Sequence, residues 1–301
     1  MEGDSPMMTL DIRHTTTYRY ARPVTFGDHR LMFRPRDSHD LRLVETGLVI
    51  SPAPSGVRWL HDVFGNSIAV ASFDQPAAEL RFESRIRVEH YPLGELEFPI
   101  EDYARAYPFS YTAEEVPDLS LTTQRHYPDP DHLVDDWAKR FVLLGEGGPP
   151  DTQEMLVSMT RSIKEGFAYQ ARDLMGTQSP VETLQLSSGS CRDFALLMME
   201  AARSLGFAAR FVSGYLYDPA RDGAAGDAVV GGGATHAWVE IYLPGAGWVE
   251  FDPTNGIIGG SNLIRVAVAR DPTQAVPLSG SWTGAPADFL GMTVDVQVTS
   301  V

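Results

Sequence analysis

Apolar and polar residues alternate along two stretches near the start of the chain. The first stretch has its recurring positions at Leu10, Ile12, His14, Thr16, Tyr18 and Tyr20. The second has them at Leu80, Phe82, Ser84, Ile86 and Val88. A period of two places successive side chains on opposite faces of a strand, and Gly65-Asn66 suits a turn between strands. Short alternating strands of this kind predict a β-sandwich domain over residues 1–92.

The alternation fades over residues 93–130, where prolines recur, and we expect an inter-domain crossing there. Helices are predicted at 131–141 and 151–166, the second with a capping-box-like start at Asp151 and Glu154. Strands are predicted further on, at residues 209–217, 236–243, 248–252, 265–269 and 293–299. Residues 131–301 are therefore expected to form a second, α+β domain that includes the C-terminal strands.

A further helix is predicted to begin at the only cysteine of the sequence, Cys191. Small residues precede it (SSGS, 187–190), and Gly206 suits the helix end. Apolar residues follow the cysteine at helical spacing, at Phe194, Leu197, Met198, Ala201 and Leu205. The first turn of a helix favours the reactive thiolate, whereas a lone cysteine is more commonly a small buried residue. This pattern alone leaves both a nucleophile and a core thiol open.

A histidine and an aspartate follow on two predicted strands, at His236 and Asp252. A base that is oriented by a carboxylate is what a nucleophilic thiol requires. The length of the loop between the strands decides whether the two side chains can meet. A four-residue loop at 244–247 would pair Val239 with Asp252 and put His236 on the opposite face. A three-residue loop at 244–246 would pair Trp238 with Asp252 and put His236 on the same face as Asp252.

Four ordered motifs resemble those of the bacterial transglutaminase-like superfamily. They are GSCRDFA at 189–195, LGFAARFVSGY at 205–215, HAWVE at 236–240, and GW at 247–248 with FDPTN at 251–255. The region from IRHTT at 12–16 to DVFGN at 62–66 resembles the β-rich part that precedes this core in bacterial members. The resemblance implies a papain-like catalytic domain, in which a helix bearing the cysteine packs on an antiparallel sheet bearing the histidine and the aspartate. It also implies a Cys191-His236-Asp252 triad.

Secondary site residues are less sharply indicated. A second oxyanion donor, beside the backbone N–H of Cys191, could come from Tyr169 or Gln185, although core and surface roles suit them equally. Trp238 and Trp248 are expected to be cleft wall or core. Residues 222–234, rich in glycine and alanine, suggest either a flexible loop at the cleft or an idle surface excursion. The histidines are scattered without metal-binding spacing, so we expect neither a metal nor another cofactor.

Charge and composition restrict the partners and the compartment. The formal net charge of −16 would repel nucleic-acid backbones and anionic membranes. With one cysteine, no apolar secretory segment at the start and no long apolar run, the sequence favours a cytoplasmic protein.

We expect a cysteine protease or amidase that hydrolyses amide or peptide bonds of a peptide or protein substrate through a thioester. Two alternatives remain. An amine could resolve the thioester, giving a glutamine γ-glutamyltransferase, or the fold could serve as a non-catalytic binding module.

Overall fold

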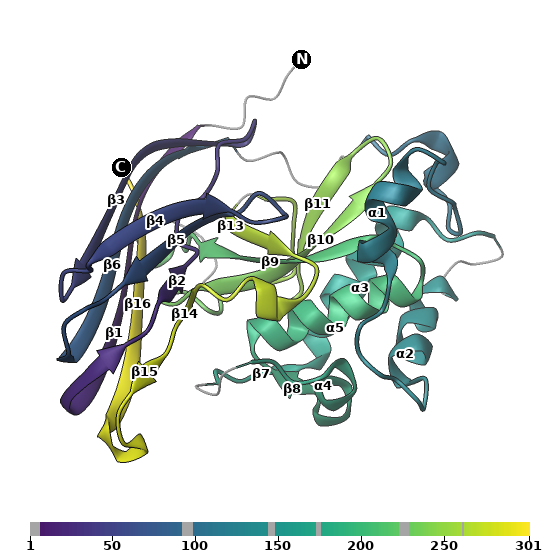
Figure 1. Ribbon diagram of the computed structural model, residues 1–301. Coiled ribbons are helices and arrows are strands. Elements are labelled where there is room, and N and C mark those ends of the chain that lie inside the picture. Colours follow the sequence, from purple (N-terminus) through teal and green to yellow (C-terminus); the bar gives the residue numbers. More distant parts are fainter. Residues whose placement is uncertain (1–6, 92–98, 144–147, 173–175, 223–228, 261) are drawn as a thin grey trace.

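Two antiparallel sheets, built from both ends of the chain, form a β-sandwich (Figure 1). They belong to a computed structural model that describes residues 7–91, 99–143, 148–172, 176–222, 229–260 and 262–301. One sheet has the order β15-β1-β6-β3, with β16 also paired to β1, and the other has the order β14-β2-β5-β4. Their strands are β1 (Met8–Phe26), β2 (His29–Leu31), β3 (Leu41–Ser51), β4 (Gly56–His61), β5 (Ser67–Ser72), β6 (Ala77–His90), β14 (Leu278–Ser279), β15 (Trp282–Thr283) and β16 (Phe289–Ser300).

The position of the C-terminal strands differs from the expectation. β16 pairs with β1 along most of its length, from Leu10 opposite Ser300 to Tyr20 opposite Phe289, and so belongs to the N-terminal sheet. β14 and β15 likewise pair with β2 and β1. Periodicity identifies a strand but not its partner, which is why the sequence grouped these strands with the second domain. The division into 1–92, 93–130 and 131–301 otherwise stays a prediction.

A third antiparallel sheet carries the helix that begins at Cys191. Its order is β12-β11-β10-β9-β13, and α5 packs mainly on β10. The strands are β9 (Ala209–Leu216), β10 (His236–Leu243), β11 (Gly247–Asp252), β12 (Ile257–Ile258) and β13 (Leu263–Ala269), and a parallel pair is formed by β7 (Ala168–Tyr169) and β8 (Ser188–Gly189). The predicted α+β architecture, a β-sandwich followed by a helix that packs on an antiparallel sheet, is thereby confirmed.

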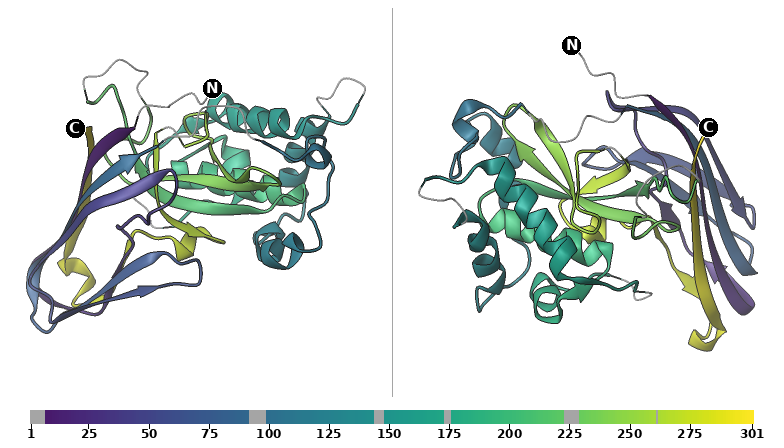
Figure 2. Two further views of the ribbon diagram at one scale, coloured as in Figure 1. Left: turned by 90° about the horizontal axis from the view of Figure 1, so that it is seen from above. Right: turned by 180° about the vertical axis from the view of Figure 1, so that it is seen from behind.

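The helices lie on the side of the molecule away from the sandwich (Figure 2). They are α1 (Glu115–Thr123), α2 (Leu133–Val142), α3 (Thr152–Gly166), α4 (Pro180–Leu186) and α5 (Cys191–Ser204), with short 3-10 turns at Asp102–Ala104, Pro272–Gln274 and Pro286–Asp288. α2, α3 and α5 match the predicted helices closely, whereas α1 and α4 were not predicted. α4 has a sequence signal that could have found it, a capping box of Ser179 and Glu182 with Pro180 at the first helical position.

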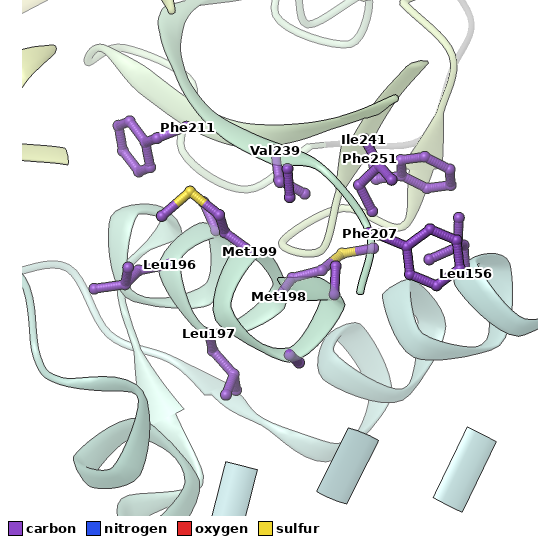
Figure 3. Packing of buried hydrophobic residues seen from close by; sticks show 14 of the residues in the cluster. Leu156, Leu196, Leu197, Met198, Met199, Phe207, Phe211, Val239, Ile241 and Phe251 are labelled. Atoms are coloured by element: carbon purple, nitrogen blue, oxygen red, sulfur yellow. The ribbon is translucent and has the colours of Figure 1, made fainter. Parts of the chain in front are cut away.

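The core beneath the third sheet is centred on α5. Leu196, Leu197, Met198 and Met199 are all fully buried, because this helix is surrounded by the sheet and by other helices (Figure 3).

A separate cluster joins the two parts of the molecule, since Leu10 and Ile86 of the sandwich pack with Tyr215 and Ile264 of β9 and β13. None of the helices in the described ranges is both long and apolar enough to cross a membrane.

Candidate active site

Cys191 is the first residue of α5, as the sequence predicted, and its helix start is strongly fixed. The fully buried carboxylate of Asp193 accepts hydrogen bonds from the backbone N–H and the hydroxyl of Ser190, both at 2.8 Å. It also accepts from the backbone N–H of Gln178 at 2.6 Å and from Arg172 Nη1 at 3.1 Å. A Cβ at Gly189 would lie 2.8 Å from the Cβ of Asp193, so only glycine fits there. This network places the thiol at the positive end of the helix dipole.

His236 and Asp252 meet because the loop between β10 and β11 has three residues. Leu243 pairs with Gly247 and Val239 with Phe251, which leaves residues 244–246 as the loop. This is the second of the two registers considered above, and it places both side chains on one face of the sheet. The Nε2 atom of His236 lies 2.8 Å from Oδ2 of Asp252. Both side chains are buried, so the hydrogen bond is shielded from water.

Asp252 is held in its ionised form by its surroundings. The backbone N–H of Thr254 donates to Oδ1 at 2.9 Å, and the Nδ2 of Asn255 donates to Oδ2 at 2.8 Å. Burial alone would raise the pKa of Asp252, but the charge of His236 and these hydrogen bonds outweigh it and lower the pKa. Asp252 is therefore a fixed anion behind the histidine.

His236 is correspondingly stabilised as an imidazolium. Burial would lower the pKa of His236, yet the charge and hydrogen bond of Asp252 and the nearby Cys191 raise it to about 10. The other ring nitrogen, Nδ1, has no partner of regular hydrogen-bond geometry among the described residues, although the thiol lies close enough to contribute to this shift. The arrangement can therefore hold a thiolate beside an imidazolium.

Tyr169 reaches this site and Gln185 does not. β7 runs parallel to β8, with Tyr169 opposite Gly189, two residues before the cysteine. Burial, and next the charge of Cys191, raise the pKa of Tyr169 to about 12, so its hydroxyl is a proton donor at neutral pH. Gln185 is exposed on α4, and none of the hydrogen bonds found for the described site residues reaches it.

Of the two tryptophans expected to be cleft wall or core, Trp238 is a core residue and Trp248 lies away from the site. Trp238 is fully buried and stacks on the ring of His236, with centroids 6.1 Å apart, and so supports the histidine from the core side. Trp248 lies next to the loop at 244–246, under the guanidinium of Arg210 and beside Tyr242. It is thus at the opposite end of β11 from Asp252.

Two further site components were not recognised in the sequence. Asn255 lies in the FDPTN motif, but its hydrogen bond to Asp252 was not predicted. Gly231 lies against His236, since a Cβ built on it would be 3.0 Å from Nδ1. This contact concerns the expected loop at 222–234, of which residues 223–228 lie outside the described part. Within the described residues no group of three histidine, cysteine or acidic side chains could hold a metal ion.

Comparison with known proteins relates two regions of the chain to described families. Residues 10–89 match the bacterial transglutaminase-like N-terminal region, and residues 139–253 match the transglutaminase-like superfamily. An uncharacterized protein of Mycobacterium tuberculosis, Rv2569c, is 30% identical over 302 residues, which covers 95% of this chain and 91% of that protein. An uncharacterized protein of Mycobacterium leprae, ML0607, is 27% identical over 290 residues, covering 96% and 99% of the two chains.

One solved structure shares the fold over nearly the whole chain. It is a "putative cysteine protease" from Cytophaga hutchinsonii, with a TM-score of 0.71, 18% sequence identity, and coverage of 99% of this chain and 92% of that one. At that identity the likeness concerns the fold alone. Together with the two matched regions and the relative of 30% identity, it leads to one conclusion: the chain belongs to the transglutaminase-like superfamily.

Proposed function

We propose that this protein is a cysteine hydrolase that cleaves amide or peptide bonds of a peptide or protein substrate through a thioester on Cys191. The observation that carries the proposal is the hydrogen bond of 2.8 Å between His236 and Asp252, in a buried site beside a thiol at a helix start. A histidine whose pKa is raised to about 10 stays protonated beside the sulfur at neutral pH. It can therefore balance a thiolate and later protonate a leaving amine.

In the first half of the reaction, Cys191 begins as a thiolate and His236 as an imidazolium that carries a proton on Nδ1. The sulfur attacks the carbonyl carbon of the substrate, and a C–S bond forms. The resulting oxyanion accepts hydrogen bonds from the backbone N–H of Cys191 and, in this proposal, from the hydroxyl of Tyr169. The C–N bond breaks as His236 gives its Nδ1 proton to the amine, which leaves as a neutral molecule.

In the second half, water attacks the thioester carbon while His236 takes one of its protons. The C–S bond then breaks, a carboxylic acid is released, and the proton on His236 restores the starting pair. Asp252 keeps its charge throughout and orients the ring, as an orienting carboxylate does in other triads. An amine in place of water would give a cross-linked amide by the same steps.

The experiment identifies the acceptor by offering water with and without a primary amine. The protein is incubated with a peptide library, with and without a primary amine, and the products are analysed by mass spectrometry beside Cys191→Ala. We expect hydrolysed product and a trapped acyl group on Cys191 in the intact protein only. An amine adduct as the dominant product would assign the transferase instead. Equal product from the Cys191→Ala variant would contradict the proposal. The absence of both product and acylated Cys191 would contradict it too, and would favour a binding module.

A further inference from the structure

The backbone at residues 229–233 covers the edge of His236 that faces the thiol. Gly231 has a φ of +94°, and a side chain on it would lie 3.0 Å from Nδ1 of His236 and 3.9 Å from the hydroxyl of Tyr169. Only 7% of Cys191 and 2% of His236 are exposed. This segment, which we call the cover segment, borders the site on the side of Nδ1, so an acyl group that approaches the sulfur from this side has to displace it.

A single side chain, Asn255, fastens the cover segment to the catalytic carboxylate. Its Oδ1 accepts from the backbone N–H of Val230 at 2.8 Å, and its Nδ2 donates to the carbonyl of Val230 at 3.2 Å. The same Nδ2 donates to Oδ2 of Asp252 at 2.8 Å. The side-chain amide of Asn255 thus pairs with the backbone of Val230 as a neighbouring strand would. It also provides one of the three hydrogen-bond donors to Asp252.

The other attachments of the cover segment are independent of Asp252. The carbonyl of Gly233 accepts from the backbone N–H of Val296 in β16 at 3.0 Å, and Val229 packs near Trp238. Val230 itself is 40% exposed, so its backbone bonds to Asn255, and not side-chain packing, hold it. Breaking the two bonds of Val230 would free the middle of the segment while both flanks remain attached.

We propose that Asn255 is a positioning residue that couples the covering of Cys191 to the orientation of Asp252. When substrate displaces the cover segment, the amide of Asn255 loses Val230 and is free to reorient, which changes the set of donors on Asp252. When the segment returns, it excludes water from the site and restores all three donors. This inference rests on the proposed function, because it assumes a reactive Cys191 beside His236.

The test compares alkylation of Cys191 by a small reagent, iodoacetamide, with alkylation by a bulky one, fluorescein maleimide. The ratio of the two rates reports access, because a change in thiol reactivity alters both rates together. We expect Asn255→Ala to raise the ratio of the fluorescein maleimide rate to the iodoacetamide rate about tenfold, because one or two hydrogen bonds that hold the cover segment are lost. Gly231→Ala should raise it as well, since its Cβ would press on His236.

A matched control lies in the same segment. A Cβ on Gly232 would meet neighbours only at ordinary contact distance, 3.4 Å or more, so Gly232→Ala should keep the ratio of the unaltered protein. The pH profile of iodoacetamide alkylation gives the positioning readout, because Asn255→Ala removes a donor from Asp252 and should shift the profile, whereas Gly232→Ala should not.

Two results would overturn the inference in different ways. If Cys191 is alkylated but both Asn255→Ala and Gly231→Ala keep the original ratio and profile, Asn255 does not control access. If iodoacetamide leaves Cys191 unmodified in every folded variant, the thiol is inert and the proposed function fails as well.

Discussion

The carboxylate of Asp252 accepts hydrogen bonds from three donors, His236, Thr254 and Asn255. Asp252→Asn would turn one of its oxygens into a donating amide and remove the charge that raises the pKa of His236. We expect the pKa of His236 to fall well below about 10, as measured by NMR titration of the ring. Turnover should drop by less than about four orders of magnitude, the loss in the serine-enzyme template, because a thiol ionises with less help.

The companion measurement is thermal unfolding, which should show a native fold of somewhat lower stability, since one buried donor then faces another donor. An unchanged titration of His236 would mean that Asp252 does not act through its charge.

The sequence was sufficient to name the three residues that the structure brings together, and insufficient to name those around them. The helix start left a core thiol open for Cys191, and strand parity placed His236 beside Asp252 only for a loop of three residues. The triad was therefore named from the resemblance to transglutaminase-like motifs. The contacts of Asn255 and Gly231 could not be predicted, although Asn255 lies in the FDPTN motif, because they depend on where the chain returns over the sheet. That is a long-range property which neither periodicity nor a local motif encodes. The catalytic roles themselves stay a prediction.

The strands β9 and β13 approach so closely that they allow no side chain at Gly214, the residue opposite His236 in β9. A Cβ there would lie 2.2 Å from the carbonyl oxygen of Ile264 and 2.6 Å from the ring of Trp238. We expect Gly214→Ala to lower the free energy of unfolding by about 1–3 kcal/mol, because overpacking forces the strands apart. Chemical denaturation followed by circular dichroism would measure this.

Gly56→Ala in β4 is the matched control, since a Cβ at that position meets nothing within 4 Å. Equal stability of the two variants would show that the contact between β9 and β13 is loose.

Individual elements were predicted more reliably than their partners. The helix expected at 151–166 is observed as Thr152–Gly166, and the strand expected at 236–243 as His236–Leu243. Both have a strong apolar period and clear ends. The strand expected at 293–299 was recognised too, but its pairing with β1 was not, because the choice of partner is settled by packing between distant parts of the chain.

The sandwich and the third sheet are joined by charge as well as by apolar packing. Arg265 lies 3.5 Å from Asp40 of the sandwich region, 3.0 Å from Glu240 and 3.2 Å from Glu250. Glu240 and Glu250 are directly opposite each other on β10 and β11. Burial is the largest cause that raises the pKa of Glu250, and the charge of Glu240 is the second; together they bring it to about 8. One carboxyl of the pair thus prefers to keep its proton in the folded state.

This pair predicts a pH dependence of stability. The pKa of Glu250 in the folded protein is above its usual value of 4.5. The contribution of Glu250 to the free energy of unfolding is therefore fully present below about pH 4.5 and is lost as the pH rises through about 8. Glu250→Gln cannot ionise and should escape that loss. We expect its melting temperature, relative to the unaltered protein, to rise steadily between pH 4.5 and 8.

Glu165→Gln, at an exposed position of α3, should show no such trend. A constant difference between Glu250→Gln and the unaltered protein over this range would mean that Glu250 is ionised in the fold.

The pairing of β1 with β16 also sets an order of events during translation. Leu10 is made before Cys191, His236 and Asp252, whereas its partner Ser300 is made after all three. Until β16 has been made, one edge of β1 has no strand beside it, and Val296, the donor to Gly233, has not yet been added. The nascent chain therefore carries Cys191, His236 and Asp252 before this attachment of the cover segment can form. Only after β16 has been added can the carbonyl of Gly233 find its partner.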